Sequence, residues 1–250
     1  MNKISYILAT NRIIPLNNLS INAIFNLAHH EKEIIVTGPI GCTSLLGEEI
    51  IKKHNIRFLE DSHFNGACQP INDAYKISDG NWVTIMSDDI IYPPNFLEIF
   101  DYIETDFFKE KDFKVVNLMF DGGPMLYTYG HDALEDGKSF WWPVSPYELL
   151  PMNAYPFNLI PMPFIHRDTI ESKLKGYLYH PLFKHHYGDS WFGFYLCKHE
   201  KFSPNKWRYN KINYIVDKQY ARCNTSHDED DLNVFKSLVQ KYLNGYDEYI

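Results

Sequence analysis

The sequence has no cluster of basic residues and no apolar run long enough to cross a membrane. Among its 250 residues, 24 Lys and Arg stand against 32 Asp and Glu, which gives a formal net charge of −8. Nucleic-acid binding without sequence preference relies on clustered cations that neutralise phosphates, so we expect no nucleic-acid partner. A membrane-spanning helix needs roughly 20 consecutive apolar residues, so we also expect no transmembrane segment.

Cysteine is scarce as well, with four residues at positions 42, 68, 197 and 223 and no CxxC pair. Zinc knuckles use closely spaced cysteine pairs, so this spacing argues against one. A reduced, cytoplasmic location is the simplest expectation for so few, widely spaced cysteines. The run Ile4–Thr10 is apolar but short and is followed by Asn11 and Arg12, which predicts a strand and not a signal peptide.

Three glycine-containing motifs are missing, and each absence argues against one class of enzyme. No GxGxxG follows the first predicted strand, which makes a dinucleotide-binding domain a weak hypothesis. No GxxxxGK followed by Ser or Thr occurs, so a P-loop NTPase is not expected. No GxSxG occurs either, which argues against an α/β-hydrolase.

Aromatic residues, by contrast, are abundant at 16% of the chain, with 18 Tyr, 17 Phe and 5 Trp. Two interpretations are open: stacking on sugars or bases, or a compositional bias that places aromatic rings in the core. Hydrophobic residues make up 45% and charged residues 22%, which is typical of a globular chain that buries one sizeable core.

Strand and helix patterns alternate along the first half of the sequence. Strands are predicted at residues 4–10, 33–37, 56–59, 82–86 and 115–120, with amphipathic helices between them. This order predicts an α/β fold with a Rossmann-like, doubly wound, mostly parallel sheet and helices on both faces.

The second half is less regular. Residues 121–163 are rich in Gly, Pro and aromatic residues and are typical of loops with short strands. Helices are predicted at residues 167–175, 189–196 and 231–243. The last of these is expected to pack back on the body of the protein as a C-terminal helix.

Polar residues follow four of the predicted strands at the point where each strand ends. In an open parallel sheet, ligands bind beyond the carboxyl ends of the strands, so these residues are expected to line one crevice. The four polar ends are Thr10-Asn11-Arg12, Thr37-Gly38, Glu60-Asp61 and Ser87-Asp88-Asp89.

Asp88 and Asp89 are adjacent carboxylates after a buried strand. Their mutual repulsion is relieved by a divalent cation, which takes oxygen ligands and bridges to substrate phosphates. The alternative is that they begin a loop or cap a helix ahead of Pro93 and Pro94. Their position at the carboxyl end of a central strand favours the metal interpretation.

Two stretches of the sequence carry a distinctive order of residues. The first is Asn65-Gly66-Ala67, followed by Asn72 and Ala74 and then by residues 78–89 and Pro93. The second is Phe164-Ile165-His166-Arg167, followed by Gly176-Tyr177, Phe183 and Gly188-Asp189. Together they resemble the core of family 2 glycosyltransferases with the GT-A fold, over about residues 3–196. In that family an N-x-G and an A-x-G pattern precede a D-x-D-type metal motif, and a later E-D-type motif carries the catalytic base.

Several positions depart from that family pattern. Ser87 replaces the first carboxylate of the D-x-D motif, and Gly188 replaces the Glu of the E-D motif. Thr37-Gly38 stands where relatives have an Asp that contacts the nucleotide base. The Q-x-x-R-W motif of processive relatives is present only as Gln219-Tyr220-Ala221-Arg222-Cys223, so a processive polymer synthase is not expected.

The resemblance implies a single GT-A domain over residues 1–250. Residues 1–120 would form the nucleotide-sugar-binding half, residues 121–227 the irregular acceptor-binding half, and residues 228–250 the C-terminal helix. The implied donor is a nucleotide-diphospho-sugar, with a UDP-sugar favoured, and the implied acceptor is a glycan or another hydroxyl compound. The donor-binding residues that it implies are Thr10, Asn11, Arg12, Thr37, Glu60, Asp61, Asn72, Ser87 and Asp88.

The resemblance also implies Mn²⁺ or Mg²⁺ on the donor diphosphate, held by Asp88 and Asp89, with His227 completing the metal shell. The alternative for His227 is a solvated turn residue. Asp189 is the implied general base, which takes the proton of the acceptor hydroxyl. The alternative for Asp189 is an N-cap of the helix that begins at Ser190.

The function implied is that of a metal-dependent, inverting, non-processive glycosyltransferase. The alternative is a catalytically silent GT-A-like module that binds a nucleotide or a glycan, which the incomplete D-x-D motif keeps open. Trp141, Trp142 and Trp191 are candidates to stack on an acceptor sugar, and Trp191 is favoured because it neighbours Asp189. Core packing is the alternative for each tryptophan.

Overall fold

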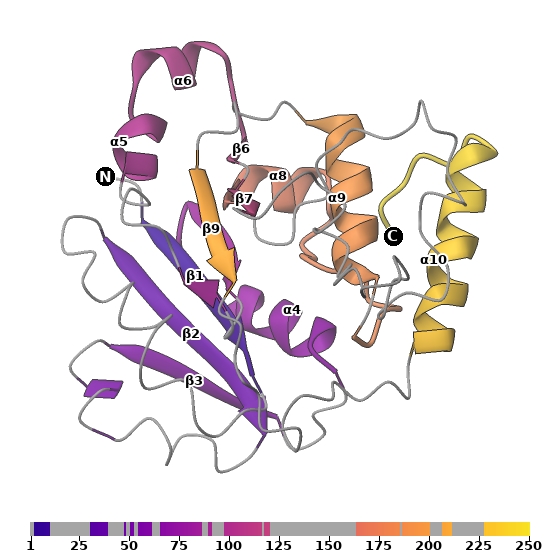
Figure 1. The fold of residues 1–250 in the computed structure, drawn as a ribbon, viewed down its shortest axis with the longest axis horizontal. Helices are drawn as coiled ribbons and strands as arrows, with labels where there is room; N and C mark the ends of the chain where they lie inside the picture. Colours follow the sequence, from indigo (N-terminus) through magenta and orange to yellow (C-terminus); the bar gives the residue numbers. More distant parts are fainter. Residues whose placement is uncertain are drawn as a thin grey trace, which may run out of the picture.

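The strands among the described residues form a six-stranded sheet and a separate three-stranded sheet (Figure 1). The computed structural model describes residues 3–10, 31–39, 48, 51–52, 55–61, 66–86, 90–91, 98–116, 118–120, 164–185, 187–200, 207–211 and 228–250. In spatial order the larger sheet consists of β3 (Ile56–Asp61), β2 (Lys32–Pro39), β1 (Ile4–Ala9), β4 (Trp82–Met86), β8 (Phe164–His166) and β6 (Val115–Val116).

The strands β1 to β4 run parallel, and their spatial order indicates where a ligand would bind. β1 lies between β2 and β4, so that Ile4 pairs with Lys32 on one side and with Trp82 on the other. The strand order therefore reverses between β1 and β4. Open α/β sheets bind their ligands at such a reversal, beyond the carboxyl ends of the strands, which here means beyond Ala9 and Met86.

β8 runs antiparallel between β4 and β6. Ile165 pairs with Val83 on one side and with Val115 on the other, and His166 pairs with Trp82. Because β8 has three residues, it is too short to show a strand periodicity in the sequence. The larger sheet is thus mostly parallel, as predicted, with one antiparallel strand in its interior.

The prediction of a single strand over residues 115–120 is wrong. β6 ends at Val116 and belongs to the larger sheet, whereas β7 (Leu118–Phe120) belongs to the smaller one. In the smaller sheet, β9 (Trp207–Lys211) lies between β5 (Ile90–Ile91) and β7. A mostly apolar run does not reveal a change of sheet, because the pairing partners are distant in the sequence.

Alternate residues of the central strands pack into two cores, one on each face of the larger sheet. On one face, Tyr6, Leu8 and Trp82 pack with α5 (Glu98–Ile103) and α6 (Asp106–Glu110). The period-2 alternation of strand side chains separates these residues from their neighbours Ile7 and Val83, which point to the opposite face. Helices therefore cover both faces, as the doubly wound prediction requires.

The second core is formed with side chains from most of the helices that follow β3 in the sequence. Ile7, Ile35 and Val83 pack there with side chains from four helices and from the segment 174–183. These helices are α4 (Cys68–Ile77), α8 (Arg167–Ser172), α9 (Gly188–His199) and α10 (Asp228–Leu243), drawn on one side of the sheet in Figure 1. The helices predicted near 167–175, 189–196 and 231–243 are thus confirmed as α8, α9 and α10.

A buried carboxylate holds the amino ends of the strands together. Glu33 on β2 exposes 4% of its surface and accepts hydrogen bonds from the Asp79 N–H at 2.7 Å and from Arg57 Nη1 at 3.1 Å. Gly80 lies so close to Ser5 that an added Cβ would be 2.5 Å from its Oγ. This close approach explains why position 80 is a glycine. Gly80 therefore has a structural role, and it lies at the edge of the sheet opposite the expected ligand site.

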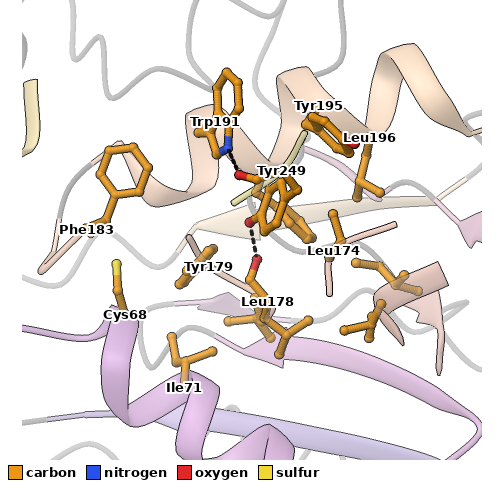
Figure 2. Packing of buried hydrophobic residues seen from close by; sticks show 14 of the residues in the cluster. Cys68, Ile71, Leu174, Leu178, Tyr179, Phe183, Trp191, Tyr195, Leu196 and Tyr249 are labelled. Atoms are coloured by element: carbon orange, nitrogen blue, oxygen red, sulfur yellow. Dashed lines mark hydrogen bonds between the residues drawn. The ribbon is translucent and has the colours of Figure 1, made fainter. Parts of the chain in front are cut away.

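The chain ends on the second core. After α10, the residues up to Tyr249 return to α9, and Tyr249 is fully buried between Trp191 and Tyr195 (Figure 2). Within the described ranges, no helix combines the length and the apolar character needed to cross a bilayer.

Candidate functional site

Thr10 and Thr37 lie together at the carboxyl ends of β1 and β2. The Thr10 N–H donates to the Thr37 carbonyl oxygen at 2.9 Å, and both side chains are buried. The Thr37 hydroxyl has no hydrogen-bond partner among the described residues. Buried hydroxyls are nearly always hydrogen-bonded, so this position is suited to a partner outside the described residues or to a ligand.

Glu60 and Asp61 end β3 at the same edge of the sheet. They pair with Gly38 and Pro39 of β2, one strand further from the reversal of strand order than Thr37. Glu60 is exposed and Asp61 is half-buried. Four of the predicted donor-site residues are therefore brought to one edge by the parallel strands, as expected.

Six other predicted site residues lie outside the described residues, and their assignments stay predictions: Asn11, Arg12, Ser87, Asp88, Asp89 and His227. The strands on either side of the carboxylate pair are described. β4 ends at Met86 in the larger sheet, and β5 begins at Ile90 in the smaller one. Among the described residues alone, no three His, Cys, Asp or Glu side chains are grouped to hold a metal ion.

Asn72 has a structural role in this fold. It is fully buried on α4, its Nδ2 donates to the Tyr179 carbonyl oxygen at 2.8 Å, and its Oδ1 accepts from the Tyr179 N–H at 2.9 Å. Both amide groups are thus used to join α4 to the segment 177–183. Nothing in this arrangement directs the Asn72 side chain toward a donor, contrary to the sequence-based expectation.

Asp189, the predicted general base, is the second residue of α9. It is half-buried, and its Oδ1 accepts from the Ser190 N–H at 2.8 Å. The N-cap position belongs to Tyr187, which is buried and has a left-handed backbone with φ 59°. Asp189 therefore supports the helix start from its first turn, where negative charge is stabilised, and the same contact orients its carboxylate.

The start of α9 lies at the same edge of the sheet as the strand ends. α4 follows β3 and leads back to β4, so its first residue, Cys68, lies at the carboxyl edge. Gly188 packs directly on Cys68, where an added Cβ would be 3.0 Å from Sγ and 3.3 Å from a ring carbon of Tyr179. A larger side chain at position 188 would therefore crowd Cys68 and Tyr179, and the first turn of α9, which carries Asp189, lies beside the start of α4.

Asp189 lies close enough to Cys68 and Tyr179 to affect their electrostatics. Burial, with further contributions from the Asp231 and Asp189 carboxylates, raises the pKa of the Cys68 thiol well above its ordinary value. Burial and then Asp189 likewise raise the pKa of Tyr179. Both groups therefore stay protonated at neutral pH, which excludes Cys68 as a nucleophile in this state.

His180, in the same segment, gives a pH-dependent prediction for stability. Burial, with a smaller effect of the Lys241 ammonium, lowers its pKa to about 4. Its Nδ1 accepts from the Leu182 N–H at 3.2 Å, which requires the unprotonated ring nitrogen. In the unfolded chain the pKa of histidine is about 6.5, so between pH 6.5 and 4 the unfolded state binds the extra proton.

Acidification from about pH 6.5 to about pH 4 is therefore expected to lower the melting temperature, with no further contribution from His180 below that window. The slope from this group is at most about 1.4 kcal/mol per pH unit. Thermal melts of the wild type and His180→Asn, whose Oδ1 replaces the Nδ1 acceptor without titrating, measure it. Equal slopes for the two proteins would contradict the prediction.

Trp191 does not form a sugar platform, so that expectation is wrong. It exposes 1% of its surface, its ring stacks on Tyr249, and its Nε1–H donates to the Tyr249 carbonyl oxygen at 3.2 Å (Figure 2). Helix phase explains the difference, because Trp191 lies two residues after Asp189 and points away from it into the core. Trp141 and Trp142 lie outside the described residues.

The structure also brings Asp231 to this region, a residue that the motifs do not include. It is fully buried near the start of α10 and accepts from the N–H groups of Lys184 and His185. The sequence carried one usable signal. Asp231 precedes Phe235 by four residues and therefore shares its apolar helix face, unlike its neighbour Asp230.

Comparisons with known proteins identify this architecture. No family model matches the sequence, and no curated protein matches it by sequence. Solved structures match it in fold. S. aureus TarS 1–349 in complex with UDP superposes with a TM-score of 0.58 at 18% identity, over 84% of this chain and 60% of that chain.

Two further solved structures agree. Mannosyltransferase PcManGT from Pyrobaculum calidifontis, in complex with GDP-Man and Mn²⁺, matches with a TM-score of 0.56 at 12% identity, over 87% of this chain and 58% of that chain. Glucosyl-3-phosphoglycerate synthase from Mycobacterium tuberculosis, in complex with Mn²⁺, UDP and phosphoglyceric acid, matches with 0.53 at 13% identity, over 98% of this chain and 78% of that chain.

These neighbours are GT-A glycosyltransferases that use nucleotide-sugars. The chain therefore has the GT-A fold, which confirms the predicted fold class. Identities of 12–18% make this a likeness of fold, and the chain spans about 60% of the TarS fragment that it matches.

Proposed function

We propose that this chain is a glycosyltransferase that moves a sugar from a nucleotide-diphospho-sugar to a hydroxyl group of an acceptor. The single observation that carries the proposal is the position of Asp189. A half-buried carboxylate, oriented by a helix start, lies at the edge of a GT-A sheet where β1 to β3 present Thr10, Thr37 and Asp61. A candidate base and a candidate donor crevice thus meet at one edge.

The reaction proposed is a single displacement with inversion at the anomeric carbon. The acceptor oxygen forms the new bond to that carbon, the bond to the diphosphate breaks, and its electron pair leaves with the nucleoside diphosphate. Asp189 takes the proton of the acceptor hydroxyl as the new bond forms. The base must lie on the face opposite the leaving group, which gives inversion. The missing Q-x-x-R-W motif supports non-processive transfer of one sugar at a time.

The nucleoside would lie over the ends of β1, β2 and β3. Thr10 and Arg12, with Glu60 or Asp61, are the residues proposed to contact it, and a UDP-sugar is the favoured donor. TarS and the phosphoglycerate synthase are solved with UDP, and PcManGT is solved with GDP-Man, so both bases occur on this fold.

Asp88 and Asp89 are the residues proposed to hold Mn²⁺ or Mg²⁺, with His227 as a further ligand. Carboxylate oxygens suit both ions, and the pair follows β4 at the reversal of strand order. Such an ion stabilises the negative charge that develops on a diphosphate leaving group. PcManGT and the phosphoglycerate synthase are solved with Mn²⁺, which supports manganese as the first ion to test.

Thermal stabilisation by nucleotides tests this assignment directly. UDP with Mn²⁺ is expected to stabilise the wild type by about 2.7 kcal/mol at a hundredfold excess over Kd, because it binds only the folded chain. Asp88→Ala/Asp89→Ala is expected to lose the metal-dependent part of that shift. Melts with UDP, GDP and CDP, each with and without Mn²⁺, measure both effects.

Asp168→Ala is the matched control for that experiment. Asp168 is an exposed carboxylate in the first turn of α8, which follows His166 at the amino edge of β4, opposite the proposed site. It should keep the full shift. No metal-dependent shift with any nucleotide would contradict the proposed function, whereas a shift without transfer activity would favour the catalytically silent module.

A further inference from the structure

We infer that Asp231 is a positioning residue for the proposed base, an inference that rests on the proposed function. Its two carboxylate oxygens accept hydrogen bonds from consecutive backbone N–H groups, from Lys184 at 2.9 Å and from His185 at 2.8 Å. Asp231 is fully buried, so water does not compete for these bonds. The carboxylate thereby fixes the backbone of residues 184–185, a few positions before Asp189.

The start of α4 holds the same two residues from another direction. The Cys68 N–H donates to the Lys184 carbonyl oxygen at 3.1 Å, and the Ala67 N–H donates to His185 Nδ1 at 3.3 Å. Gly66 approaches so closely that an added Cβ would be 2.2 Å from the Lys184 carbonyl oxygen. Residues 184–185 are therefore fixed between α10 and α4.

α10 makes a second contact, with Tyr187, which lies two residues before Asp189. Phe235, one turn after Asp231 on the same helix face, packs against the Tyr187 ring with centroids 5.5 Å apart. Tyr187 and Gly188 are both buried, and Gly188 rests on Cys68. We therefore expect a shift of residues 184–185 to displace Asp189, because Tyr187 and Gly188 between them are buried and closely packed. Misplacement of a catalytic group by about 1 Å can cost roughly 10²-fold in rate.

The chemistry of position 231 favours a carboxylate specifically. Two N–H groups that point the same way need two acceptor oxygens, and Asn offers one oxygen and one NH₂ group, which would face the other N–H. Burial of a carboxylate is unfavourable unless such bonds compensate for it, and the nearby helix start stabilises its charge further. Asp230 lacks these features, since it is exposed and pairs with the Lys184 ammonium at 3.0 Å.

Asp231→Asn tests the inference, with Asp230→Asn as the matched control. Three quantities are measured on the full chain: turnover with saturating donor and acceptor, Kd for UDP with Mn²⁺, and hydrogen exchange of the peptide 183–190. Asp231→Asn is expected to lower kcat by about 10-fold or more, to leave the UDP Kd within about twofold of wild type, and to speed exchange in that peptide. Asp230→Asn should change none of the three.

A double-mutant test separates positioning from general loss of stability. In an Asp189→Asn background there is no base left to misplace, so adding Asp231→Asn should lower residual turnover by less than about twofold. An equal loss in both backgrounds would overturn the inference. Unchanged exchange in Asp231→Asn, or faster exchange with wild-type kcat, would also overturn it.

Gly66→Ala is the second test if Asp231→Asn does not fold. Its added methyl group, just before α4, would displace residues 184–185. It should also lower kcat and leave the UDP Kd near wild type, and normal turnover in a folded Gly66→Ala protein would overturn the inference. A wild-type chain that binds UDP but transfers no sugar would instead overturn the proposed function, and the exchange measurement would still show whether Asp231 fixes this backbone.

Discussion

Asp189→Asn is expected to lower the rate of sugar transfer by about 10²- to 10⁴-fold, the usual contribution of a positioned general base. Asn keeps the Oδ1 that accepts from the Ser190 N–H, so the start of α9 should remain intact. The substitution removes basicity and little else. Affinity for the donor nucleotide should therefore be unchanged, because only the proton transfer from the acceptor is lost.

Single-turnover assays of the wild type and the variant, together with titrations of UDP in the presence of Mn²⁺, measure the two effects separately. Asp168→Asn is the matched control, since Asp168 is the second residue of α8 as Asp189 is of α9. It should keep wild-type turnover. Near-normal transfer by Asp189→Asn would show that another group is the base.

Tyr249→Ala is expected to destabilise the fold by about 3–5 kcal/mol, the usual cost of truncating a large buried aromatic side chain to Ala. Tyr249 exposes none of its surface, and its hydroxyl donates to the Leu178 carbonyl oxygen at 2.9 Å (Figure 2). It joins the segment 174–183 to α9 from a position after the last helix. For a chain of this size the melting temperature should fall by roughly 6–20 °C.

Tyr249→Phe separates the ring from the hydroxyl. It keeps the stacking on Trp191 and leaves the Leu178 carbonyl without this donor, which should cost about 1–3 kcal/mol. Urea unfolding of the wild type and both variants gives the order wild type, Phe, Ala in falling stability. A Tyr249→Ala protein as stable as the wild type would show that the tail after α10 does not contribute to the core.

The parallel half of the fold could be predicted because its signals are local. β1, β2, β3 and β4 are strands of five to eight residues that are rich in apolar side chains, and their periodicity and order imply the sheet. The antiparallel strand β8 and the passage from β6 to β7 depend on partners that are far apart in the sequence. Periodicity within one segment carries no information on those partners.

The candidate site divides in a similar way. The motif identifies Asp189 by its place relative to Gly176 and Phe183; the structure puts it in the first turn of α9, beside the start of α4, and its role as the base stays a prediction. Asn72 belongs to a motif for a different reason, since its amide supports the Tyr179 backbone. A motif records that a residue type is required at a position, and burial and hydrogen bonding decide whether that requirement is chemical or structural.

Asp231 and Trp191 are two residues whose roles the sequence does not predict correctly. Asp231 stands in an acidic run that resembles a solvated helix start, and only its phase relative to Phe235 separates it from Asp230. Nearness to Asp189 in the sequence favours Trp191, but helix positions two residues apart face different directions. Nearness in the sequence does not show that two side chains share a helix face unless the rotation of about 100° per residue is applied.

Strands from the two halves of the chain interleave in both sheets. β8 comes from the second half of the chain, yet it lies between β4 and β6 of the first half, and β9 likewise lies between β5 and β7. A fragment of residues 1–120 would lack β8, the described neighbour of β6, and would separate β5 and β7 from β9, their shared partner. We therefore expect the proposed donor and acceptor halves to unfold in one cooperative transition, with neither reaching its native structure by itself.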